Sequence, residues 1–332
     1  MHNQADVKAR TGSVFLDLAS LDRDDLDLSA LERVCEPLQR FPRTGIDELA
    51  DRAREAWCVI VNKVVLDRTF FEARPALRLV CVVATGTNNV DLEAAADHGV
   101  TVVNCQGYGT DSLAQHVLML ILALARSFPR YQADVAEGAW SRSSQFCLLD
   151  HPIREVGGRR LGIVGYGAIG RAVNRLAEAI GMEVVIADRP GASPRAGRMA
   201  FDEVVATSDV ISLHCPLNAQ TRGLFDAHVL QRMQSDALLI NTARGGLVDE
   251  AALVRALREG WIGGAAVDVV SSEPPAPDNP LLAAGLDNLI VTPHCAWGSR
   301  EARQRIVDQT TENIEAWLDG RPLRRVVEGC AN

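Results

Sequence analysis

RLGIVGYGAIGRA, residues 160–172, links an apolar, β-type run to a helical pattern through three glycines. Gly165, Gly167 and Gly170 stand in the spacing G-x-G-x-x-G, and the helix begins near Ala168. The first glycine permits a tight turn, the second lets backbone amides approach a pyrophosphate, and the third allows close packing of helix on strand. The positive N-terminus of the helix then faces the anion. The strand, loop and helix together predict a dinucleotide-binding βαβ unit.

The acidic residue that ends the next strand indicates which dinucleotide binds. Asp188 lies 18 residues after Gly170. Its carboxylate can accept both ribose hydroxyls of NAD, whereas it would repel the 2′-phosphate of NADP, so the sequence favours NAD over NADP. Arg189, followed by Arg195 and Arg198, leaves a second interpretation open, in which an arginine stacks on adenine or binds a phosphate. An exposed arginine is also commonly a solvated loop charge.

Composition and charge exclude several classes of protein. Of the 332 residues, 47% are hydrophobic and 23% are charged, which is typical of a folded globular chain long enough for two domains. A formal net charge of −9, without a Lys/Arg-rich run, argues against nucleic-acid binding. The longest apolar stretch, 117–125, is about half of what a bilayer crossing needs, and the N-terminus has no apolar signal segment. We therefore expect a cytoplasmic protein that is not attached to a membrane.

The cysteines show neither a C-x-x-C pair nor Cys/His ligand spacing. We expect reduced thiols in or near the core, and no metal site. The eight positions are Cys35, Cys58, Cys81, Cys105, Cys147, Cys215, Cys295 and Cys330.

Apolar β-type runs alternate with helical patterns along almost the whole chain, which predicts an α/β fold with parallel sheets covered on both faces. Six runs in the second half complete one doubly wound sheet. These runs are 160–164, 183–188, 210–215, 237–243, 264–270 and 288–294. Four runs in the first hundred residues need a sheet of their own, which gives two doubly wound domains. They are 14–18, 58–62, 78–86 and 100–104.

Two helices fall outside these repeats. Residues 111–127 read as a long apolar helix, which Ser112 and Gln115 would open as a capping box and which we expect to pack between domains or subunits. Residues 299–319 read as a further helix that stops at Gly320, and the pattern does not say which domain it joins.

Three polar residues follow neighbouring strands of the predicted second sheet. Arg244 lies in NTARGG, Glu273 in VVSSEPP and His294 in TPH. Each has an ordinary explanation: an interdomain ion pair, a solvated carboxylate and a hydrogen-bonded rim histidine. Ligands of open α/β sheets bind outside the carboxyl ends of the strands, however, so the three together predict an active site.

The order of these motifs closely resembles the D-isomer-specific 2-hydroxyacid dehydrogenase family. The likeness covers nearly the whole chain and includes INTARGGLVDE, AAVDVVSSEPP and VTPHCAWGS. Within the family the chain is most similar to glycerate dehydrogenases, also called hydroxypyruvate reductases. That similarity is carried by VNK (61–63), VATGTNNVDL (83–92) and NCQGYGTDSLAQH (104–116).

The resemblance implies a domain organisation that the pattern alone does not give. Residues 1–107 with 299–332 would form a flavodoxin-like substrate domain, and residues 108–298 a Rossmann NAD-binding domain. It also implies a homodimer built around the nucleotide domains, which would explain the very apolar helix segment at 113–125.

The resemblance further assigns cofactor contacts. Asp268 matches the position that hydrogen-bonds the nicotinamide carboxamide, although an Asp there could also cap backbone amides. His214, Cys215 and Pro216 would line the adenine side, for which a strand-end turn is an equally good explanation. The expected cofactor-binding residues are Thr110, Gly165, Gly167, Ala168, Ile169, Gly170, Asp188, Arg189, His214, Cys215, Pro216, Thr242, Ala243 and Asp268.

The chemistry of a 2-oxo acid assigns roles to the strand-end residues. Hydride transfer to C2 requires that the carbonyl oxygen be polarised and protonated, so His294 is expected to be the acid. Glu273 would stabilise the imidazolium and orient the ring. Arg244 presents a planar fork suited to a carboxylate, and by resemblance it also contacts the reacting oxygen.

The first domain is expected to complete the substrate site. Thr85 and Gly86 follow a strand and can offer backbone N–H groups to the substrate carboxylate, or they form an ordinary turn. Asn62 and Lys63 also follow a strand and could shape the pocket around a distal hydroxyl, although a lysine at a loop tip is usually solvated.

These observations favour an NAD-dependent enzyme acting on a small substrate, glycerate/hydroxypyruvate or glyoxylate. A non-catalytic, NAD-sensing scaffold similar to transcriptional corepressors shares the fold and is the first alternative. Formate or phosphite oxidation on the same fold is the second. Glu273 speaks against formate oxidation, because formate dehydrogenases of this type resemble a pattern with Gln beside the histidine.

Overall fold

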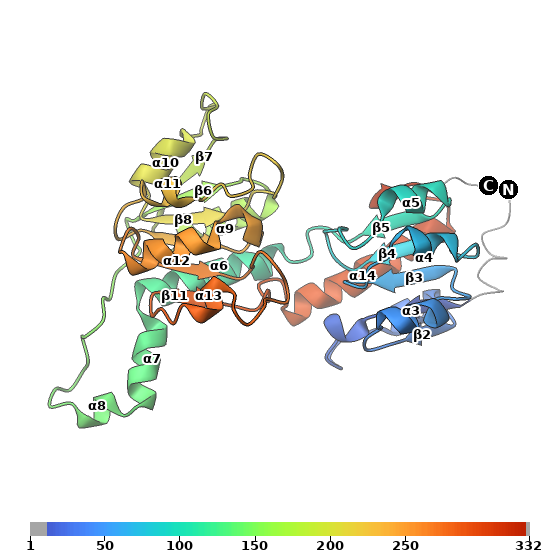
Figure 1. Cartoon of the computed structure of the whole chain (residues 1–332), viewed down its shortest axis with the longest axis horizontal. Helices are drawn as coiled ribbons and strands as arrows, with labels where there is room; N and C mark the ends of the chain where they lie inside the picture. Colours follow the sequence, from blue (N-terminus) through green and yellow to red (C-terminus); the bar gives the residue numbers. More distant parts are fainter. Residues whose placement is uncertain (1–11, 330–332) are drawn as a thin grey trace. The chain divides into compact units, whose positions relative to one another are not determined.

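The computed structural model describes residues 12–329, which form two compact units. The first unit ends at Gly109 and resumes at Gly298, and the second runs from Thr110 to Trp297. Each unit holds a sheet of six strands (Figure 1). Cys330 and the ends of the expected substrate domain, residues 1–11 and 330–332, lie outside the described residues.

The sheet of the second unit is parallel throughout and doubly wound, as the sequence predicts. Its order is β11-β10-β9-β8-β6-β7, so the strand order reverses at β6, which lies between β7 and β8. Each of the six expected runs supplies one strand. The strands are β6 (Arg160–Val164), β7 (Glu183–Ala187), β8 (Val210–Leu213), β9 (Leu238–Asn241), β10 (Gly264–Val267) and β11 (Leu289–Val291).

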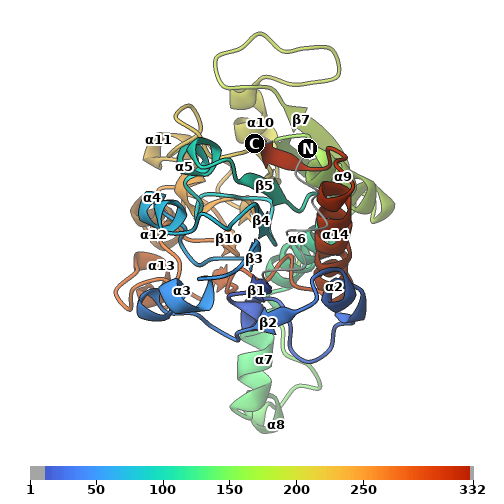
Figure 2. The same cartoon turned by 90° about the vertical axis from the view of Figure 1, so that its right-hand side faces the viewer.

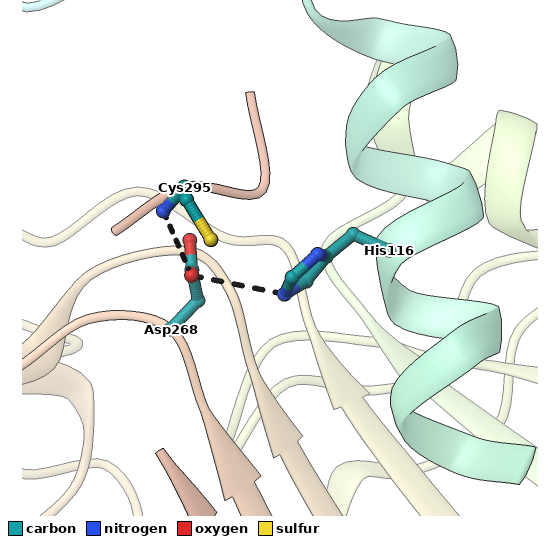
Figure 3. Close-up of side chains that lie close together, drawn as sticks. All are labelled: His116, Asp268 and Cys295. Atoms are coloured by element: carbon teal, nitrogen blue, oxygen red, sulfur yellow. Dashed lines mark hydrogen bonds and ion pairs between the residues drawn. The ribbon is translucent and has the colours of Figure 1, made fainter. Parts of the chain in front are cut away.

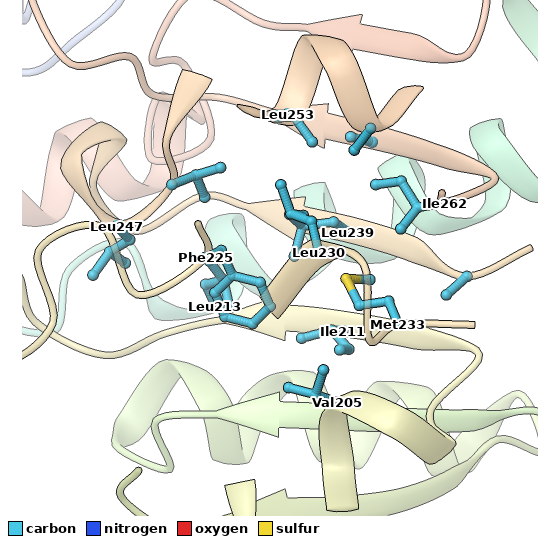
Figure 4. Close-up of a cluster of buried hydrophobic side chains, with 14 of the residues drawn as sticks. Val205, Ile211, Leu213, Phe225, Leu230, Met233, Leu239, Leu247, Leu253 and Ile262 are labelled. Atoms are coloured by element: carbon cyan, nitrogen blue, oxygen red, sulfur yellow. The ribbon is translucent and has the colours of Figure 1, made fainter. Parts of the chain in front are cut away.

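Helices cover both faces of this sheet because alternate strand residues point to opposite sides. On one face Ile163 and Ile240 pack with α6 (Thr110–Ala125) and α9 (Ala168–Ala179). On the other face Leu213 and Leu239 belong to the cluster drawn in Figure 4. The helices that contribute to this cluster are α10 (Phe201–Thr207), α11 (Ala227–Leu230), α12 (Glu250–Arg258) and α13 (Pro280–Ala283).

Helix α6 begins earlier than its sequence pattern suggests, and the predicted capping box is wrong. The helix starts at Thr110, so Ser112 lies inside its first turn. The Ser112 hydroxyl donates to the carbonyl of Ala296 at 2.7 Å instead of capping the helix. The apolar face of α6 packs against the sheet of its own unit through Val117, Leu120 and Ile121.

Beyond α6 the chain continues through α7 (Phe128–Ala136) and α8 (Ala139–Arg142), which extend away from the sheet of their unit (Figure 1). Within the described residues no helix alone has the length and hydropathy of a membrane span. Helices α6 and α7 reach that length and hydropathy only when they are counted as one segment, and the chain bends by 64° between them.

The first unit has the strand order β12-β5-β4-β3-β1-β2. Its five parallel strands follow the flavodoxin-like order 2-1-3-4-5, with the strand order reversing between β1 and β3. They are β1 (Ser13–Phe15), β2 (Leu38–Arg40), β3 (Cys58–Val61), β4 (Leu79–Val82) and β5 (Thr101–Asn104). The sixth strand, β12 (Arg325–Val327), pairs antiparallel with β5. The sequence patterns did not indicate β2 or β12.

Helices flank this sheet on both sides (Figure 2). One side carries α3 (Ile46–Arg52), α4 (Arg68–Glu72) and α5 (Leu92–Asp97). The other carries α2 (Ser29–Val34) and α14 (Arg300–Leu318). A short 3-10 turn, η1 (Leu18–Ser20), follows β1.

Helix α14 matches the helix expected at 299–319 and belongs to the first unit. The Ser299 side chain caps it by accepting from the Ala302 N–H, and Gly320 follows its end with φ of 71°. Trp317 stacks on Trp57 with ring centroids 5.3 Å apart. This apolar contact shows why the last helix returns to the sheet formed by the first hundred residues.

The three glycines of the loop after β6 differ in what surrounds them. Gly165 has φ of 100°, and a Cβ there would lie 2.4 Å from the backbone nitrogen of Cys215. A Cβ on Gly170 would lie 2.3 Å from the carbonyl oxygen of Gly165. A Cβ on Gly167 would meet nothing within 4 Å. Two of the glycines are therefore needed for the fold, whereas the fold alone does not require the third.

This difference predicts unequal losses of stability for two matched substitutions. Gly170→Ala places a methyl group against backbone and should destabilise the second unit by about 1–3 kcal/mol. Gly167→Ala meets no atoms but replaces the N-cap glycine of α9 by the poorer cap Ala, and it should cost less, about 0.5–1 kcal/mol. Thermal and urea unfolding followed by circular dichroism would measure both, and equal stabilities would contradict this account of the loop.

Candidate active site

Three neighbouring strands of the second unit bring Arg244, Glu273 and His294 to one edge of the sheet. Arg244 follows β9, Glu273 follows β10 and His294 follows β11, and these strands are adjacent and parallel. Their carboxyl ends therefore lie side by side, at the edge where α/β sheets bind ligands.

His294 and Glu273 form a close pair. The distance from Nδ1 of His294 to Oε2 of Glu273 is 2.5 Å, and the two side chains are 36% and 35% exposed. The other carboxylate oxygen of Glu273 accepts from the backbone N–H of Val270 at 3.1 Å. The carboxylate is thus held in place while the imidazole faces it with Nδ1, which leaves Nε2 directed elsewhere.

The backbone of His294 adopts an unusual conformation. Its φ of 51° lies in the left-handed region, which costs a non-glycine residue about 1–2 kcal/mol. The His294 N–H donates to the carbonyl of Asp268 at 2.8 Å and to that of Thr292 at 3.0 Å. Strained backbone of this kind is concentrated at functional sites.

Asp268 organises the turn that carries His294. Its carboxylate is buried and accepts from the hydroxyl of Thr292 at 2.5 Å and from the N–H groups of Cys295 and Ala296 at 2.9 and 3.0 Å. His116 of α6 reaches the same Thr292 hydroxyl, with Nε2 at 3.1 Å. Sequence reasoning missed Thr292 and His116, although Thr292 lies within the TPH motif that was used.

His116, Asp268 and Cys295 come together in Figure 3. Their potential ligand atoms all lie within 4.8 Å of one another, as in some metal sites. Both carboxylate oxygens of Asp268 nevertheless already accept hydrogen bonds within the turn. Burial also raises the pKa of the Cys295 thiol, which opposes the thiolate form that binds metals. The geometry of this group is thus that of a hydrogen-bonded network.

Arg244 is exposed and lies in a tightly held loop that continues into the 3-10 turn η2 (Gly245–Leu247). Its guanidinium donates to the carbonyl of Ala243 at 2.7 Å, and it forms no ion pair with the described residues. The amide of Asn241 donates to the Arg244 carbonyl at 2.9 Å. A Cβ on Gly245 would lie 2.0 Å from the carbonyl carbon of Val270, so this loop packs on the one that carries Glu273.

Two features of the second unit fit a bound dinucleotide. The space beside Gly167 at the N-terminus of α9 is open, so a phosphate can approach the helix there. The hydroxyl of Thr242 is buried without a hydrogen-bond partner among the described residues, and a ligand group at this place would satisfy it. Ala168 and Ile169 form the first turn of α9, Ala243 follows Thr242, and Thr110 is the first residue of α6.

The carboxyl end of β8 lies against the glycine loop. The backbone of His214 and Cys215 contacts Gly165, and exposed Pro216 follows. Nε2 of His214 lies 2.9 Å from the Ser212 hydroxyl, and burial lowers the pKa of His214 to about 4. The ring is therefore neutral near pH 7. This contact is made at the strand-order reversal, where doubly wound sheets bind their ligands.

At the end of β7, Asp188 is buried and its carboxylate is already hydrogen-bonded. It accepts from the backbone N–H groups of Arg189 and Arg195 at 2.8 and 2.9 Å and from the Arg195 guanidinium at 2.6 Å. These bonds, chiefly the one from the Arg195 side chain, hold the pKa of Asp188 well below its usual range. The Arg189 side chain is exposed.

In the first unit a carboxylate that sequence reasoning missed holds the loop after β3. Asp17 follows β1, is buried, and accepts from the N–H groups of Asn62 and Lys63 at 2.8 and 2.7 Å. Burial raises the pKa of Asp17, although these bonds oppose the rise. In the sequence Asp17 lies inside the apolar run 14–18, so the signal available was a lone acidic residue in that run.

The other two predicted substrate residues follow β4. The Thr85 hydroxyl donates to the carbonyl of Cys105 at 2.9 Å, and the Asn104 amide donates to the Thr85 carbonyl at 2.8 Å. Gly86 is partly exposed beside it. Thr85 and Gly86 thus lie at the same carboxyl edge of the first sheet as Asn62 and Lys63.

Comparisons with known proteins show to which family the chain belongs. The model of the family described as D-isomer specific 2-hydroxyacid dehydrogenase, NAD binding domain, matches residues 118–296. The chain is 43% identical over 310 residues to a glycerate dehydrogenase of Methylorubrum extorquens, which covers 93% of this chain and 98% of that protein. It is 38% identical over 319 residues to a hydroxypyruvate reductase of Blautia hydrogenotrophica, with 94% and 98% covered.

A solved structure shows the same fold. The NADPH-dependent glyoxylate/hydroxypyruvate reductase of Sinorhizobium meliloti, in complex with citrate, superimposes with a TM-score of 0.78 at 29% identity and covers 96% of this chain and 98% of that one. The matches extend over both units. The chain therefore belongs to the D-isomer specific 2-hydroxyacid dehydrogenase family and is an NAD-binding oxidoreductase of that family.

Proposed function

We propose that this enzyme interconverts a small D-2-hydroxy acid and its 2-oxo acid, with glycerate and hydroxypyruvate as the main pair and glyoxylate as a further substrate. The observation that carries the proposal is the 2.5 Å contact between His294 Nδ1 and Glu273 Oε2. It provides an oriented proton donor at the sheet edge that also holds the dinucleotide loop.

The choice of substrate is supported by the relatives. Glycerate dehydrogenase and hydroxypyruvate reductase are the names of proteins 43% and 38% identical to this chain over nearly its full length. These relatives are enzymes, which supports catalysis over the alternative of an NAD-sensing scaffold. Glu273 beside the histidine continues to speak against formate oxidation.

Proton transfer is assigned to His294. When bound, NADH would supply a hydride to C2 of the 2-oxo acid, and NAD+ would accept one from C2 of the 2-hydroxy acid. In reduction, Nε2 of His294 gives its proton to the carbonyl oxygen, and in oxidation the neutral ring takes a proton from the hydroxyl. Glu273 faces Nδ1, so it keeps a proton on that nitrogen and compensates the charge of the imidazolium.

Arg244 is assigned to the substrate's anionic groups. Its guanidinium forms no ion pair with the described residues, and its backbone is fixed by Asn241 and by the packing of Gly245. A planar guanidinium without an ion pair among the described residues is suited to a carboxylate, and it also stabilises the negative charge that develops on the reacting oxygen.

The remaining site residues are assigned to units. We propose that the first unit is the substrate domain, in which Asn62, Lys63, Thr85 and Gly86 bind the substrate. The second unit is the NAD-binding domain. Its proposed cofactor contacts are Thr110, Gly165, Gly167, Ala168, Ile169, Gly170, Asp188, Arg189, His214, Cys215, Pro216, Thr242, Ala243 and Asp268. Among the described residues, the carboxylate oxygen Oδ2 of Asp268 accepts only from the Ala296 N–H, so it retains capacity for a carboxamide.

Assembly as a homodimer in the cytoplasm is part of the proposal. The extension formed by α7, α8 and the loop after them exposes Phe128, Trp140, Phe146 and Leu149 by 57%, 52%, 90% and 75%. Apolar side chains gathered in this way commonly mark a protein interface. None of the seven described cysteines forms a disulfide bond, which is the usual state in a reducing compartment.

The proposed function predicts turnover with a defined set of substrates. Purified protein should oxidise NADH in the presence of hydroxypyruvate and, with a lower kcat/KM, glyoxylate. Pyruvate and phenylpyruvate serve as controls, because they lack the distal hydroxyl that the loop at 62–63 is proposed to bind. Absorbance at 340 nm reports the rate. Turnover with none of the four would refute the proposal and favour a scaffold.

The role of His294 predicts a loss in the chemical step. His294→Ala should lower kcat by roughly a hundredfold to ten-thousandfold, the usual contribution of a general acid, while the NADH dissociation constant stays close to that of the wild type. His228→Ala, which removes an exposed histidine on α11 of the same unit, is the matched control and should retain full activity. An unchanged kcat in His294→Ala would remove this residue from the role of acid.

The contact of Asp17 with the loop at 62–63 predicts an effect on substrate binding alone. One amide oxygen in Asp17→Asn cannot replace the two carboxylate oxygens that accept from Asn62 and Lys63. The KM for hydroxypyruvate should rise roughly tenfold, which corresponds to one lost charge-assisted hydrogen bond, while NADH affinity is retained. Asp91→Asn, in which Asn still caps α5, should leave both values unchanged. Equal KM values in all three proteins would exclude Asp17 from positioning this loop.

A further inference from the structure

The adenosine end of the nucleotide site has an unusual charge arrangement. The inference drawn from it rests on the NAD site proposed above. The carboxylate of Asp188 has about four lone-pair positions. Four close donors use them: Oδ1 accepts from Arg189 N at 2.8 Å and Arg195 Nη2 at 2.6 Å, and Oδ2 accepts from Arg195 N and Nε at 2.9 Å each. In this conformation Asp188 has no free acceptor for a ribose diol.

The Arg195 side chain is the component that can move. Asp188 is only 2% exposed in its side chain, whereas the Arg195 side chain is 58% exposed. Two of the four donors are backbone N–H groups, so they remain when the guanidinium leaves. Rotation of one exposed side chain therefore releases one acceptor position on each carboxylate oxygen and leaves the loop in place.

The surrounding loop carries excess positive charge. Residues 188–198 contain three arginines, Arg189, Arg195 and Arg198, against the single carboxylate of Asp188. Arg198 has a weak bond to the carbonyl of Ala187 at 3.4 Å, and neither Arg189 nor Arg198 forms an ion pair with the described residues. A phosphate monoester, with about −1.5 to −2 charges near neutral pH, would be attracted to this loop.

We propose that Arg195 makes this site accept NADP(H) as well as NAD(H). With NADP, Arg195 pairs with the 2′-phosphate through its planar fork while it still compensates Asp188, which removes the repulsion expected from a bare carboxylate. With NAD, Arg195 turns to solvent and Asp188 accepts the ribose hydroxyls. Arg195 is thus a specificity-determining residue at the end of the cofactor remote from the chemistry.

Equilibrium binding tests this proposal without relying on turnover. Isothermal titration calorimetry of the full-length wild-type protein with NADH and with NADPH should give two dissociation constants within about tenfold of each other. The NADPH value should rise more steeply with salt, because a 2′-phosphate contact is screened. Adenosine 2′,5′-bisphosphate should bind more tightly than 5′-AMP, since the two differ in the 2′-phosphate.

Substitution at 195 separates a specificity role from a structural one. Arg195→Ala should weaken NADPH roughly 10- to 100-fold, as expected for lost charge-assisted bonds, while NADH binds as well or better because Asp188 is released. Arg195→Lys keeps the charge but not the planar fork. Its dissociation constant for NADPH should lie between those of the wild type and Arg195→Ala. Arg232→Ala removes a partly exposed arginine of the same unit that pairs with Asp202 at 2.9 Å, and it should alter neither affinity.

Three results would overturn the proposal. A wild-type gap larger than about tenfold in favour of NADH would show that Asp188 excludes the 2′-phosphate despite Arg195. Equal weakening of both nucleotides by Arg195→Ala would show that the ion pair only maintains the loop. Failure of the wild type to bind either nucleotide would refute the dinucleotide site itself, and with it the function on which this inference rests.

Discussion

The buried carboxylate of Asp268 connects the strand ends on which the active site depends. Its oxygens accept from Thr292, Cys295 and Ala296, and its backbone carbonyl accepts from the N–H of His294. Helix α6 reaches the same turn through the bonds Ser112–Ala296 and His116–Thr292. Without this carboxylate three donors would lose their acceptor, and the loss at the buried Ala296 N–H alone would cost about 1–3 kcal/mol. These bonds therefore stabilise the observed conformation of the turn.

This constraint explains how His294 can hold a left-handed backbone. Its φ of 51° is unfavourable by about 1–2 kcal/mol, and the hydrogen bonds made by Asp268 around it offset that cost. The conformation directs the imidazole toward Glu273, whose carboxylate is fixed in turn by the N–H of Val270. The ring is thus oriented before substrate binds, and little reorganisation is needed when the proton moves.

The sequence predicted the repeating part of this structure, because hydrophobic period and glycine spacing are local properties. All six strands of the second sheet and the helix at 299–319 follow from such patterns. Strands β2 and β12 were missed because they are short, partly exposed edge strands with little apolar pattern. Contacts between residues far apart in sequence were also missed, namely Asp17 with the loop at 62–63 and His116 with Thr292. Residue spacing alone does not predict such contacts.

Two aspartates of the second unit show how an ionic group can be held rigidly or adjustably. Asp268 is held by backbone amides and by a hydroxyl inside the fold, so its geometry is fixed. Half of the close donors to Asp188 belong to one exposed guanidinium, which can exchange its partner without moving the loop. Hydride and proton transfer tolerate little displacement, so rigidity is needed beside His294. The adenosine end of the site only binds the cofactor and takes no part in the chemical step. An ion pair that can rearrange there, Arg195 with Asp188, therefore does not slow the reaction.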